Sequence, residues 1–516
     1  MSTTTTERRS MTVSQESGAE PFAAEAFRPL IHYTAADRWI NDPNGLVHHG
    51  GLYHLFFQYN PYGTDHGFMS WGHAVSPDLV RWEDRPVAIL CDEDEQIFSG
   101  SAVVDSGNSA GFGPDGSSPL VAVYTSHYSD SSPYPKTQAQ SLAYSLDGGE
   151  SWTKHHGNPV LNRGSSDFRD PKVFRYQGPA GEYWVMVAVE AVDRKVVLYR
   201  SLDLKDWTYL SEFTSTEVVG QIWECPDLFP LALDGDPDEV RWVLVVSFNQ
   251  EEGNGGSKGI YFIGDFDGTR FTSAAAENAR QAEWEWLDHG RDYYAAVSFN
   301  DAPEGRRIMI GWMNNWEYAK DLPTNPWRGS MSVARDLSLH REQGRLVLRQ
   351  RPAALPDSAG IAVEVPPLAV LEGCRSLPAL PSGQAARLEV RLVRELASEM
   401  GLVLRAGEGE ETVLGYDVET EELFLDRRWA GGGDLGPFFA SRESAPLTLD
   451  DGGLGLTVIL DAGSVEVFAG DGRCVITDQI FSRDESVGLY AYAKGGSARI
   501  EGFSLTPLAA APVIRR

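Results

Sequence analysis

Short apolar or alternating runs, broken by turn residues, make up the chain from Ile31 onward. Examples are LYHLFFQY (52–59), PLVAVYTS (119–126), YWVMVAVE (183–190), RWVLVVSF (241–248) and RRIMIGW (306–312). Short runs rich in β-branched and aromatic residues, bounded by Gly, Pro, Asn or Asp, are typical of β-strands. No convincing long run repeats apolar residues at helical spacing. The pattern therefore predicts an all-β protein.

A turn aspartate followed by an aromatic residue recurs along the first two thirds of the chain. The pairs are Asp78 and Trp82, Asp147 and Trp152, Asp203 and Trp207, and Asp267 and Phe271. Each unit closes a group of expected strands, at intervals of roughly 50–70 residues, which in an all-β chain favours propeller blades over a sandwich. Expected strands within 293–312 and 330–348 add one more group. The sequence predicts a five-bladed β-propeller over residues 27–350.

The residue composition and the hydrophobic pattern change on either side of this region. Residues 1–26 are aperiodic and rich in Ser, Thr, Glu and Ala, which predicts a flexible tail. Residues 351–361 are rich in Pro and Ala and form the expected linker. Alternating runs separated by Gly and Asp turns then fill residues 362–510. They predict a C-terminal β-sandwich.

Composition narrows the classes of partner. The 516 residues are 42% hydrophobic and 23% charged, an ordinary globular balance, and the net charge is −30. Such a charge argues against nucleic acid or an anionic membrane surface as a partner. The N-terminus has no apolar signal region, so the sequence as written predicts a cytoplasmic protein, or a secreted one if a leader has been removed. A monomer is the default expectation and a dimer the alternative.

Three carboxylates stand in motifs that can carry chemistry: Asp42 in WINDPNG, Asp170 in FRDP and Glu224 in WECPDLF. Taken singly, Asp42 could cap a hairpin turn, Glu224 could face solvent, and Asp170 could form a structural ion pair with Arg169. Taken together, two carboxylates that flank a sugar bond are the general equipment for glycoside hydrolysis. Aromatic and short polar side chains, which bind sugars, are plentiful in the same half of the chain.

The motifs and their order resemble glycoside hydrolase family 32, the β-fructofuranosidases. WINDPNG, FSGS, FRDP and WECPDLF follow in the family's order, and LFFQYNP, SWGHAVS, GWMNNWEYA, PWRGSMSVARDL and LDAGSVEVFAGDG also look like family segments. The resemblance covers about residues 29–507. It implies a five-bladed propeller followed by a β-sandwich, and a retaining two-step mechanism without metal or other cofactor.

The resemblance also implies roles for single residues. Asp42 would be the nucleophile, Glu224 the acid and base, and Asp170 the group that stabilises the transition state. The residues expected to hold the terminal fructose are Asn41, Gln58, Trp71, Phe98, Ser99, Arg169 and Trp312. Asp42 must be ionised to attack and so needs hydrogen-bond donors, whereas Glu224 must begin protonated and needs an apolar wall or a like charge. A retaining pair is about 5–5.5 Å apart.

The substrate class follows from the same resemblance. GWMNNWEYA and PWRGSMS look more like exo-acting fructan hydrolases, of the levanase or exo-inulinase type, than like dedicated invertases. The expected activity is release of terminal fructosyl units from levan, inulin and fructo-oligosaccharides, with sucrose as a further substrate. The alternative is a fructosyltransferase, or an enzyme that makes a disaccharide or a difructose anhydride with the same three carboxylates.

Overall fold

The structure, a computed structural model, describes residues 25 and 27–515 except 180, 218–219, 250–254, 277, 279–280 and 432–434. Within that part nearly every element is a β-strand, and the two helices, η1 (Ala274–Ala276) and η2 (Pro303–Gly305), are short 3₁₀ turns. No helix in the described part is long and apolar enough to cross a membrane. The predicted tail, residues 1–26, lies outside the described residues apart from Glu25.

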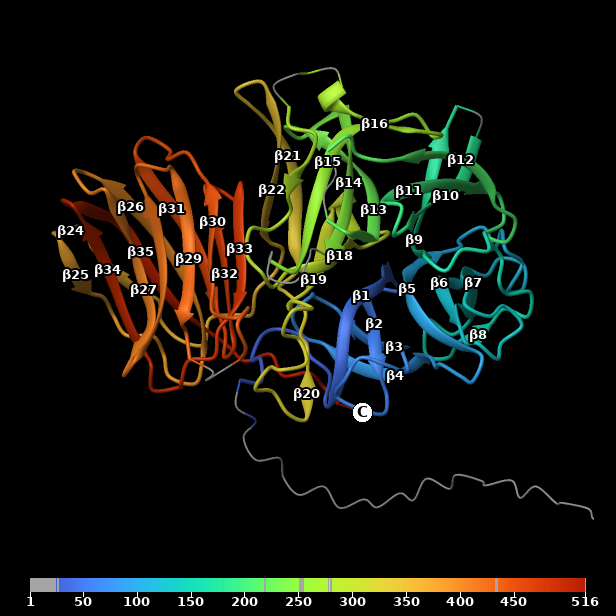
Figure 1. The fold of residues 1–516 in the computed structure, drawn as a ribbon, viewed down its shortest axis with the longest axis horizontal. Helices are drawn as coiled ribbons and strands as arrows, with labels where there is room; N and C mark the ends of the chain where they lie inside the picture. Colours follow the sequence, from blue (N-terminus) through green and yellow to red (C-terminus); the bar gives the residue numbers. More distant parts are fainter. Residues whose placement is uncertain are drawn as a thin grey trace, which may run out of the picture.

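Five blades of antiparallel strands surround a common axis and form one half of the molecule (Figure 1). The first blade contains β1 (Arg38–His49), β2 (Leu52–Asn60), β3 (Ser70–Ser76) and β4 (Glu83–Ile89), with β20 (Trp327–Arg328) beside β1. The second contains β5 (Glu95–Val104), β6 (Leu120–Tyr128), β7 (Gln138–Ser145) and β8 (Thr153–Lys154). The third contains β9 (Phe168–Gly178), β10 (Gly181–Glu190), β11 (Lys195–Ser201) and β12 (Thr208–Phe213).

The last two blades are joined in one sheet, because β13 and β21 form a parallel bridge at Leu233 and Leu339. The fourth blade contains β13 (Ile222–Leu233), β14 (Asp236–Asn249), β15 (Ser257–Phe266), β16 (Phe271–Ser273) and β17 (Glu285–Trp286). The fifth contains β18 (Tyr294–Ser298), β19 (Ile308–Trp312), β21 (Arg335–Glu342) and β22 (Arg345–Pro352). The predicted five-bladed propeller is confirmed.

The recurring aspartates form the turn between the third and fourth strands of the first four blades. Asp78, Asp147, Asp203 and Asp267 each accept backbone N–H groups from two to four residues further on, at 2.7–3.0 Å. In the first three blades a Ser hydroxyl two residues earlier also donates to the carboxylate. Such side-chain bonds replace the backbone pairs that a tight turn lacks. The repeat seen in the sequence is thus a structural unit of the blade.

The second half of the molecule is a β-sandwich of two facing sheets (Figure 1). One sheet contains β23 (Val363–Val365), β24 (Leu368–Val370), β26 (Ala385–Arg394), β31 (Gly453–Leu460), β32 (Ser464–Ala469), β33 (Cys474–Gln479) and β35 (Ala498–Leu508). The other contains β25 (Gly373–Ser376), β27 (Glu399–Gly407), β28 (Glu410–Asp417), β29 (Glu422–Trp429), β30 (Arg442–Pro446) and β34 (Gly488–Lys494). Alternate residues such as Leu388, Val390 and Leu392 point inward and build a continuous apolar core. The predicted sandwich is confirmed.

Charged residues pair with one another where the propeller meets the sandwich. Arg335 of β21 donates to Asp288 and to Glu466 of β32, both at 2.9 Å, and all three side chains are buried. His32, in the segment before β1, lies 2.7 Å from Asp461 and 2.9 Å from Glu466. The interface therefore joins three distant parts of the chain through a buried ionic network.

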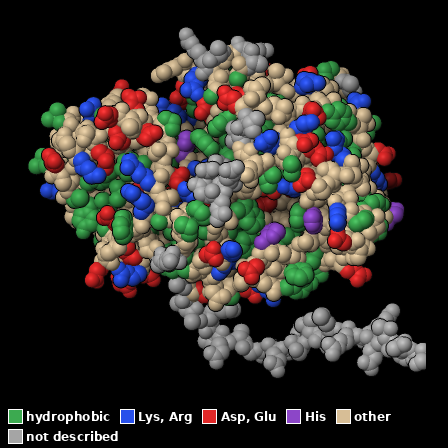
Figure 2. Space-filling view, viewed as in Figure 1, with side chains coloured by type: hydrophobic (Ala, Val, Ile, Leu, Met, Phe, Trp, Pro, Cys, Tyr) green, Lys and Arg blue, Asp and Glu red, His purple; other side chains and the backbone are tan. Residues whose placement is uncertain are grey.

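On the face shown in Figure 2, acidic and basic side chains of the described residues are interspersed rather than gathered in one patch.

Candidate active site

The innermost strand of every blade departs from regular pairing close to the propeller axis. The shifts in register lie between Ile40 and Pro43 in β1, between Phe98 and Gly100 in β5, between Arg169 and Lys172 in β9, between Glu224 and Asp227 in β13, and between Tyr294 and Val297 in β18. An extra residue at a bulge bends the strand and turns its side chains in a new direction. Asp170, Cys225 and Ala295 have φ angles of 62°, 47° and 51°, which non-glycine residues seldom adopt. These irregularities bring the three candidate carboxylates together.

Asp42 lies within the bulge of β1 and accepts hydrogen bonds from three neighbours. The Ser99 hydroxyl, on β5, donates to Oδ2 at 2.7 Å, and the Asn41 amide donates to Oδ1 at 3.1 Å. The Cys225 thiol lies 3.5 Å from Oδ2. Asn41 is itself held by the indole N–H of Trp39 at 2.7 Å. Asp42 therefore has the donors that we expected for a carboxylate that acts as a nucleophile.

Asp170 is the deepest of the three carboxylates, with 6% of its surface exposed. Its Oδ2 accepts the backbone N–H of Cys225 at 2.9 Å, and its own N–H donates to Thr125 at 2.9 Å. The Cys225 thiol, 3.7 Å from Oδ2, also contacts Asp42, so this one residue of β13 joins the two aspartates. The thiol is buried among three carboxylates, and burial first and their charges second raise its pKa well above the ordinary value. It is thus a neutral partner.

Glu224 lies on β13 at the more open side of the cluster, and 20% of its side chain is exposed. Arg169 donates to Oε1 at 3.1 Å. Asn249 donates to Oε2 at 3.0 Å, and the Tyr294 hydroxyl makes a short hydrogen bond to the same oxygen. These three donors come from the third, fourth and fifth blades, so they orient the carboxyl only when the propeller has closed.

Arg169 pairs with two of the three carboxyl groups, Glu224 at 3.1 Å and Asp170 at 3.9 Å. Burial raises the pKa of Asp42, the Ser99 hydrogen bond opposes that rise, and the charge of Glu224 adds to it. Burial also raises the pKa of Asp170 to about 7, against the pull of Arg169 and with the charges of Glu224 and Asp42 adding to the rise. We expected donors to favour the ionised form of Asp42, but burial outweighs Ser99 and Asn41 in their effect on its pKa. The pKa values of both aspartates are therefore raised, because burial exceeds what their hydrogen-bond donors and Arg169 supply.

The predicted pocket residues fall into two groups. Asn41, Gln58, Phe98, Ser99 and Arg169 surround the carboxylates or the strand segments that carry them. Gln58 of β2 donates to the backbone oxygen of Ile97 at 3.0 Å and so ties the first blade to the second beside Phe98. Phe98 keeps an accessible face, since its ring is only partly buried.

Trp71 and Trp312 form the other group, because both rings are fully buried. The indole N–H of Trp71 donates to the backbone oxygen of Phe98 at 3.0 Å, so Trp71 supports the wall from behind. Trp312 packs between Trp39 and Trp316, at centroid distances of 5.8 and 4.8 Å. Neither ring has exposed surface with which to contact a sugar. Strand alternation directs these side chains into the core, whereas the neighbouring Trp316 is only partly buried.

Several residues of the site were not predicted. Tyr294 lies in the segment RDYYAA, which resembles the family, but nothing in the sequence assigns it to Glu224. Asn249 is the last residue of an ordinary apolar strand and carries no sequence signal. Cys225 stands beside Glu224 in the motif, yet its contacts with two aspartates follow only from the positive φ that turns its backbone.

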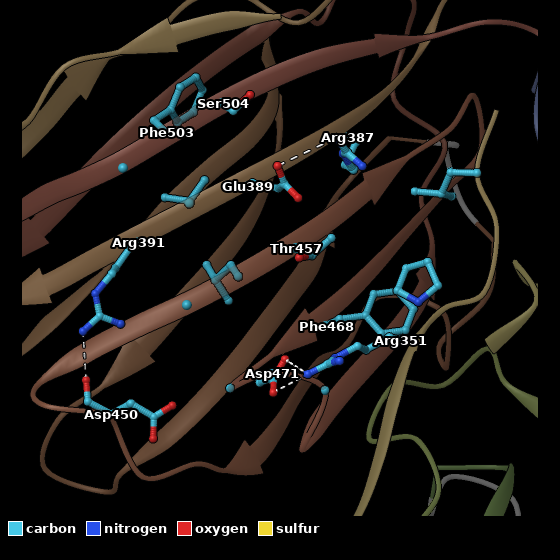
Figure 3. A pocket seen from close by; sticks show the side chains of 18 of the residues that line it. Arg351, Arg387, Glu389, Arg391, Asp450, Thr457, Phe468, Asp471, Phe503 and Ser504 are labelled. Carbon is cyan, nitrogen blue, oxygen red and sulfur yellow. Dashed lines mark hydrogen bonds and ion pairs between the residues drawn. The ribbon is translucent and has the colours of Figure 1, made fainter. Parts of the chain in front are cut away.

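A hollow of about 820 Å³ lies away from the propeller axis, on the outer face of the seven-stranded sandwich sheet (Figure 3). Its charged side chains pair with near neighbours: Arg387 with Glu389 at 3.8 Å, and Arg351 with Asp471. Arg391 donates to the backbone oxygen of Asp450 at 3.1 Å. Its three arginines thus each hold a neighbouring oxygen, unlike the propeller site, where three carboxylates gather beside one arginine.

A propeller of five blades whose inner strands bring two aspartates and a glutamate together beside an arginine is the architecture of a propeller-type glycosidase. Residues 32–352 match the glycosyl hydrolases family 32 N-terminal domain, and residues 365–507 match the glycosyl hydrolases family 32 C-terminal domain. The chain belongs to glycosyl hydrolase family 32 and is a glycosidase. The predicted family, fold class and enzyme class are confirmed.

Relatives with known activities extend over nearly the whole chain. The levanase of Bacillus subtilis is 42% identical over 96% of this chain and 73% of its own length. The extracellular exo-inulinase of Aspergillus ficuum is 39% identical over 92% of this chain and 93% of its own length. The crystal structure of exo-inulinase from Aspergillus awamori superposes with a TM-score of 0.87 and 36% identity, covering 95% of this chain and 99% of that one.

Proposed function

We propose that this enzyme releases terminal β-D-fructosyl units from levan, inulin and fructo-oligosaccharides, and from sucrose, by double displacement. In the first step, Asp42 Oδ attacks the anomeric C2 of the terminal fructosyl unit. The bond from C2 to the glycosidic oxygen breaks, and the carboxyl proton of Glu224 passes to that oxygen. In the second step, Glu224 takes a proton from water, the water oxygen bonds to C2, and the bond to Asp42 breaks. The products are fructose and a saccharide shortened by one unit.

The observation that carries this proposal is the convergence of Asp42, Asp170 and Glu224 on the bulged inner strands. Glu224 is at the open side, where a departing saccharide leaves, so it suits proton transfer. Asp42 accepts hydrogen bonds from Ser99 and Asn41, and these donors stabilise its negative charge when it attacks. Asp170, buried and close to Arg169, suits hydrogen bonding to sugar hydroxyls and adds negative charge beside a cationic transition state.

The relatives support the substrate class. A levanase and an exo-inulinase match this chain at 42% and 39% identity, and invertase 2 of Saccharomyces cerevisiae matches at 35% over 88% of the chain. Polymeric fructan cannot enter a cell, so we infer further that the enzyme acts outside it. The relative from Aspergillus ficuum is named as an extracellular exo-inulinase, which supports this inference. Fructanase activity in the culture fluid, rather than in washed cells, is the expected result.

Product chromatography on levan, inulin, sucrose and a short fructo-oligosaccharide tests the function. Fructose should accumulate alone from the first minutes, and Asp42→Asn and Glu224→Gln should each lower kcat by about 10³-fold or more, because each removes a reacting group. Asp115→Asn, on an exposed loop, is the matched control and should match the wild type. A disaccharide, a cyclic dimer or a transfer product as the main species would contradict exo-hydrolysis. Full turnover in either carboxylate variant would contradict the mechanism.

A further inference from the structure

A chain of hydrogen bonds leads from a histidine on β6 to the acid and base proposed above. His127 Nδ1 lies 3.2 Å from the amide nitrogen of Gln138, its partner across the β6–β7 ladder. The amide oxygen of Gln138 accepts Nη1 of Arg169 at 3.2 Å. Nη2 of the same guanidinium donates to Glu224 Oε1 at 3.1 Å. Four side chains from three blades thus form one continuous path.

The direction of each bond in this path is determined by the one before it. A guanidinium only donates, so Arg169 requires the oxygen of Gln138 to face it. The NH₂ group of Gln138 therefore faces His127 and must donate to it. His127 Nδ1 is then an acceptor, and the imidazole is neutral. A proton on Nδ1 would place two donors against each other, and turning the amide over would place its NH₂ group against the guanidinium.

The surroundings of His127 favour the same neutral state. Its ring stacks on Phe98, with centroids 4.5 Å apart and planes 4° from parallel. Three titratable groups face it: Arg169 and, when protonated, His66 oppose a positive charge on His127, whereas Asp167 favours one and is itself 3.5 Å from Arg169. Burial first and Arg169 second lower the pKa of His127 below its ordinary value. A moderately acidic medium is therefore needed to charge it.

We propose that His127 is a positioning residue, which holds Arg169 on Glu224 through Gln138 while it is neutral and disorders that contact when it is protonated. The inference rests on the proposed function, since Glu224 is the group whose proton transfer is measured. His127 contacts neither the reacting carboxylates nor the departing oxygen. It acts on orientation, so its loss should lower kcat more than it changes KM.

Two variants separate the acceptor from the ring. His127→Asn places an amide oxygen where Nδ1 lies and cannot take a proton in this range. It should keep kcat at pH 7 within about 2-fold and retain more activity in acid than the wild type. His127→Phe keeps the stacking on Phe98 but removes the acceptor, and it should lower kcat about 10-fold with KM changed less than about 3-fold. His156→Asn, at an exposed histidine, is the matched control.

A third variant, at Gln138, keeps the proposal testable if the variants of His127 fail to fold. In Gln138→Glu the carboxylate accepts from both Arg169 and protonated His127, so the acid limb of kcat should move to lower pH. Unchanged acid limbs in His127→Asn and Gln138→Glu would overturn the proposal. Equal losses in His127→Asn and His127→Phe would overturn it too, because the ring alone would then matter. If the wild type released no fructose, the proposed function would fail instead, which the same assay reports separately.

Discussion

Asp170 illustrates how a single residue is held in an unfavourable state for function. Its backbone has a φ of 62°, and its carboxyl is buried beside two other carboxyl groups with one guanidinium nearby. Its pKa of about 7 in the folded protein is raised, chiefly by burial, from an ordinary 3.8. A raised carboxyl pKa means that folding favours the protonated form. The stability due to this group is therefore present below about pH 4 and is lost as the pH rises to 7.

Asp170→Asn removes the loss of stability that the ionised Asp170 causes above pH 7. At pH 8 the variant should unfold at a temperature about 5 °C above that of the wild type, and at pH 4 the two should unfold together. Activity should fall by about 10²-fold or more, because the amide cannot supply negative charge at the transition state. Thermal unfolding followed from pH 4 to pH 8 measures the difference, with Asp115→Asn as the control. If the unfolding temperatures of the variant and the wild type changed in parallel with pH, a raised pKa of Asp170 would be contradicted.

The bulge of β5 shows how an element positions a catalytic partner. Ser99 stands between Phe98 and Gly100, where the register with β6 shifts by one residue. A Cβ atom on Gly100 would lie 2.1 Å from the backbone oxygen of Val123 and 2.7 Å from Cα of Tyr124. The close approach of β5 and β6 therefore requires glycine here. The position of Ser99, and through it the hydrogen bond to Asp42, depends on that approach.

Gly100→Ala should push β5 away from β6. We expect a loss of about 1–3 kcal/mol in the free energy of unfolding, a fall of about 1–3 °C in Tm, and a fall of about 10-fold in kcat/KM as Ser99 moves from Asp42. Gly107→Ala, at an exposed glycine with no atom within 4 Å of its Cβ position, is the matched control. Differential scanning calorimetry and initial rates measure the two effects. A Gly100→Ala variant with unchanged stability and kcat/KM would contradict the prediction, because it would show that β5 and β6 can move apart without cost.

At the scale of the whole molecule, buried charges hold the propeller and the sandwich together. His32 lies between Asp461 and Glu466, and Glu466 also binds Arg335 of the propeller. Burial alone would lower the pKa of His32, but the hydrogen bonds and charges of the two carboxylates outweigh it and raise the pKa to about 9. The raised pKa means that the stability due to His32 is complete below about pH 6.5 and is lost as the pH rises through 9.

His32→Asn should therefore destabilise the enzyme most in mild acid. At pH 6 the variant removes the imidazolium between Asp461 and Glu466 and leaves Glu466 with Arg335, and we expect a fall of about 3–5 °C in Tm. At pH 10 the wild type has itself lost the charge, so the difference should shrink. Unfolding temperatures measured from pH 6 to pH 10 test this, with His156→Asn as the control. A difference that stays constant across that range would exclude a charged His32.

The domain limits of 27–350 and 362–510, with a linker between them, stay predictions at this scale. The buried network argues that neither half is complete alone, since Arg427 of β29 donates to Asp292 at 2.6 Å and to the Tyr318 hydroxyl at 2.7 Å. All three side chains are buried, so separation would expose paired charges as unpaired ones. We therefore regard the sandwich as a brace for the propeller.

The sequence by itself determined the strands, the repeat of turn aspartates and the order of the family motifs, because these are local. A strand's alternation and a turn's hydrogen bonds involve residues a few positions apart, as at Asp78 and Arg81. The all-β class, the five blades and the candidates Asp42, Asp170 and Glu224 all rest on such local patterns. Their assignment to catalysis stays a proposal.

Only the tertiary structure decided which side chains meet. Asn249 and Tyr294 reach Glu224, and His127 reaches it through Gln138 and Arg169, because closing the propeller brings separate blades to one axis. The same closure buries Trp71 and Trp312 behind the wall that they were expected to line. Alternation along a strand shows that a side chain is on one face or the other. Which atoms lie opposite it depends on how the blades pack, and that arrangement is not encoded at any single position.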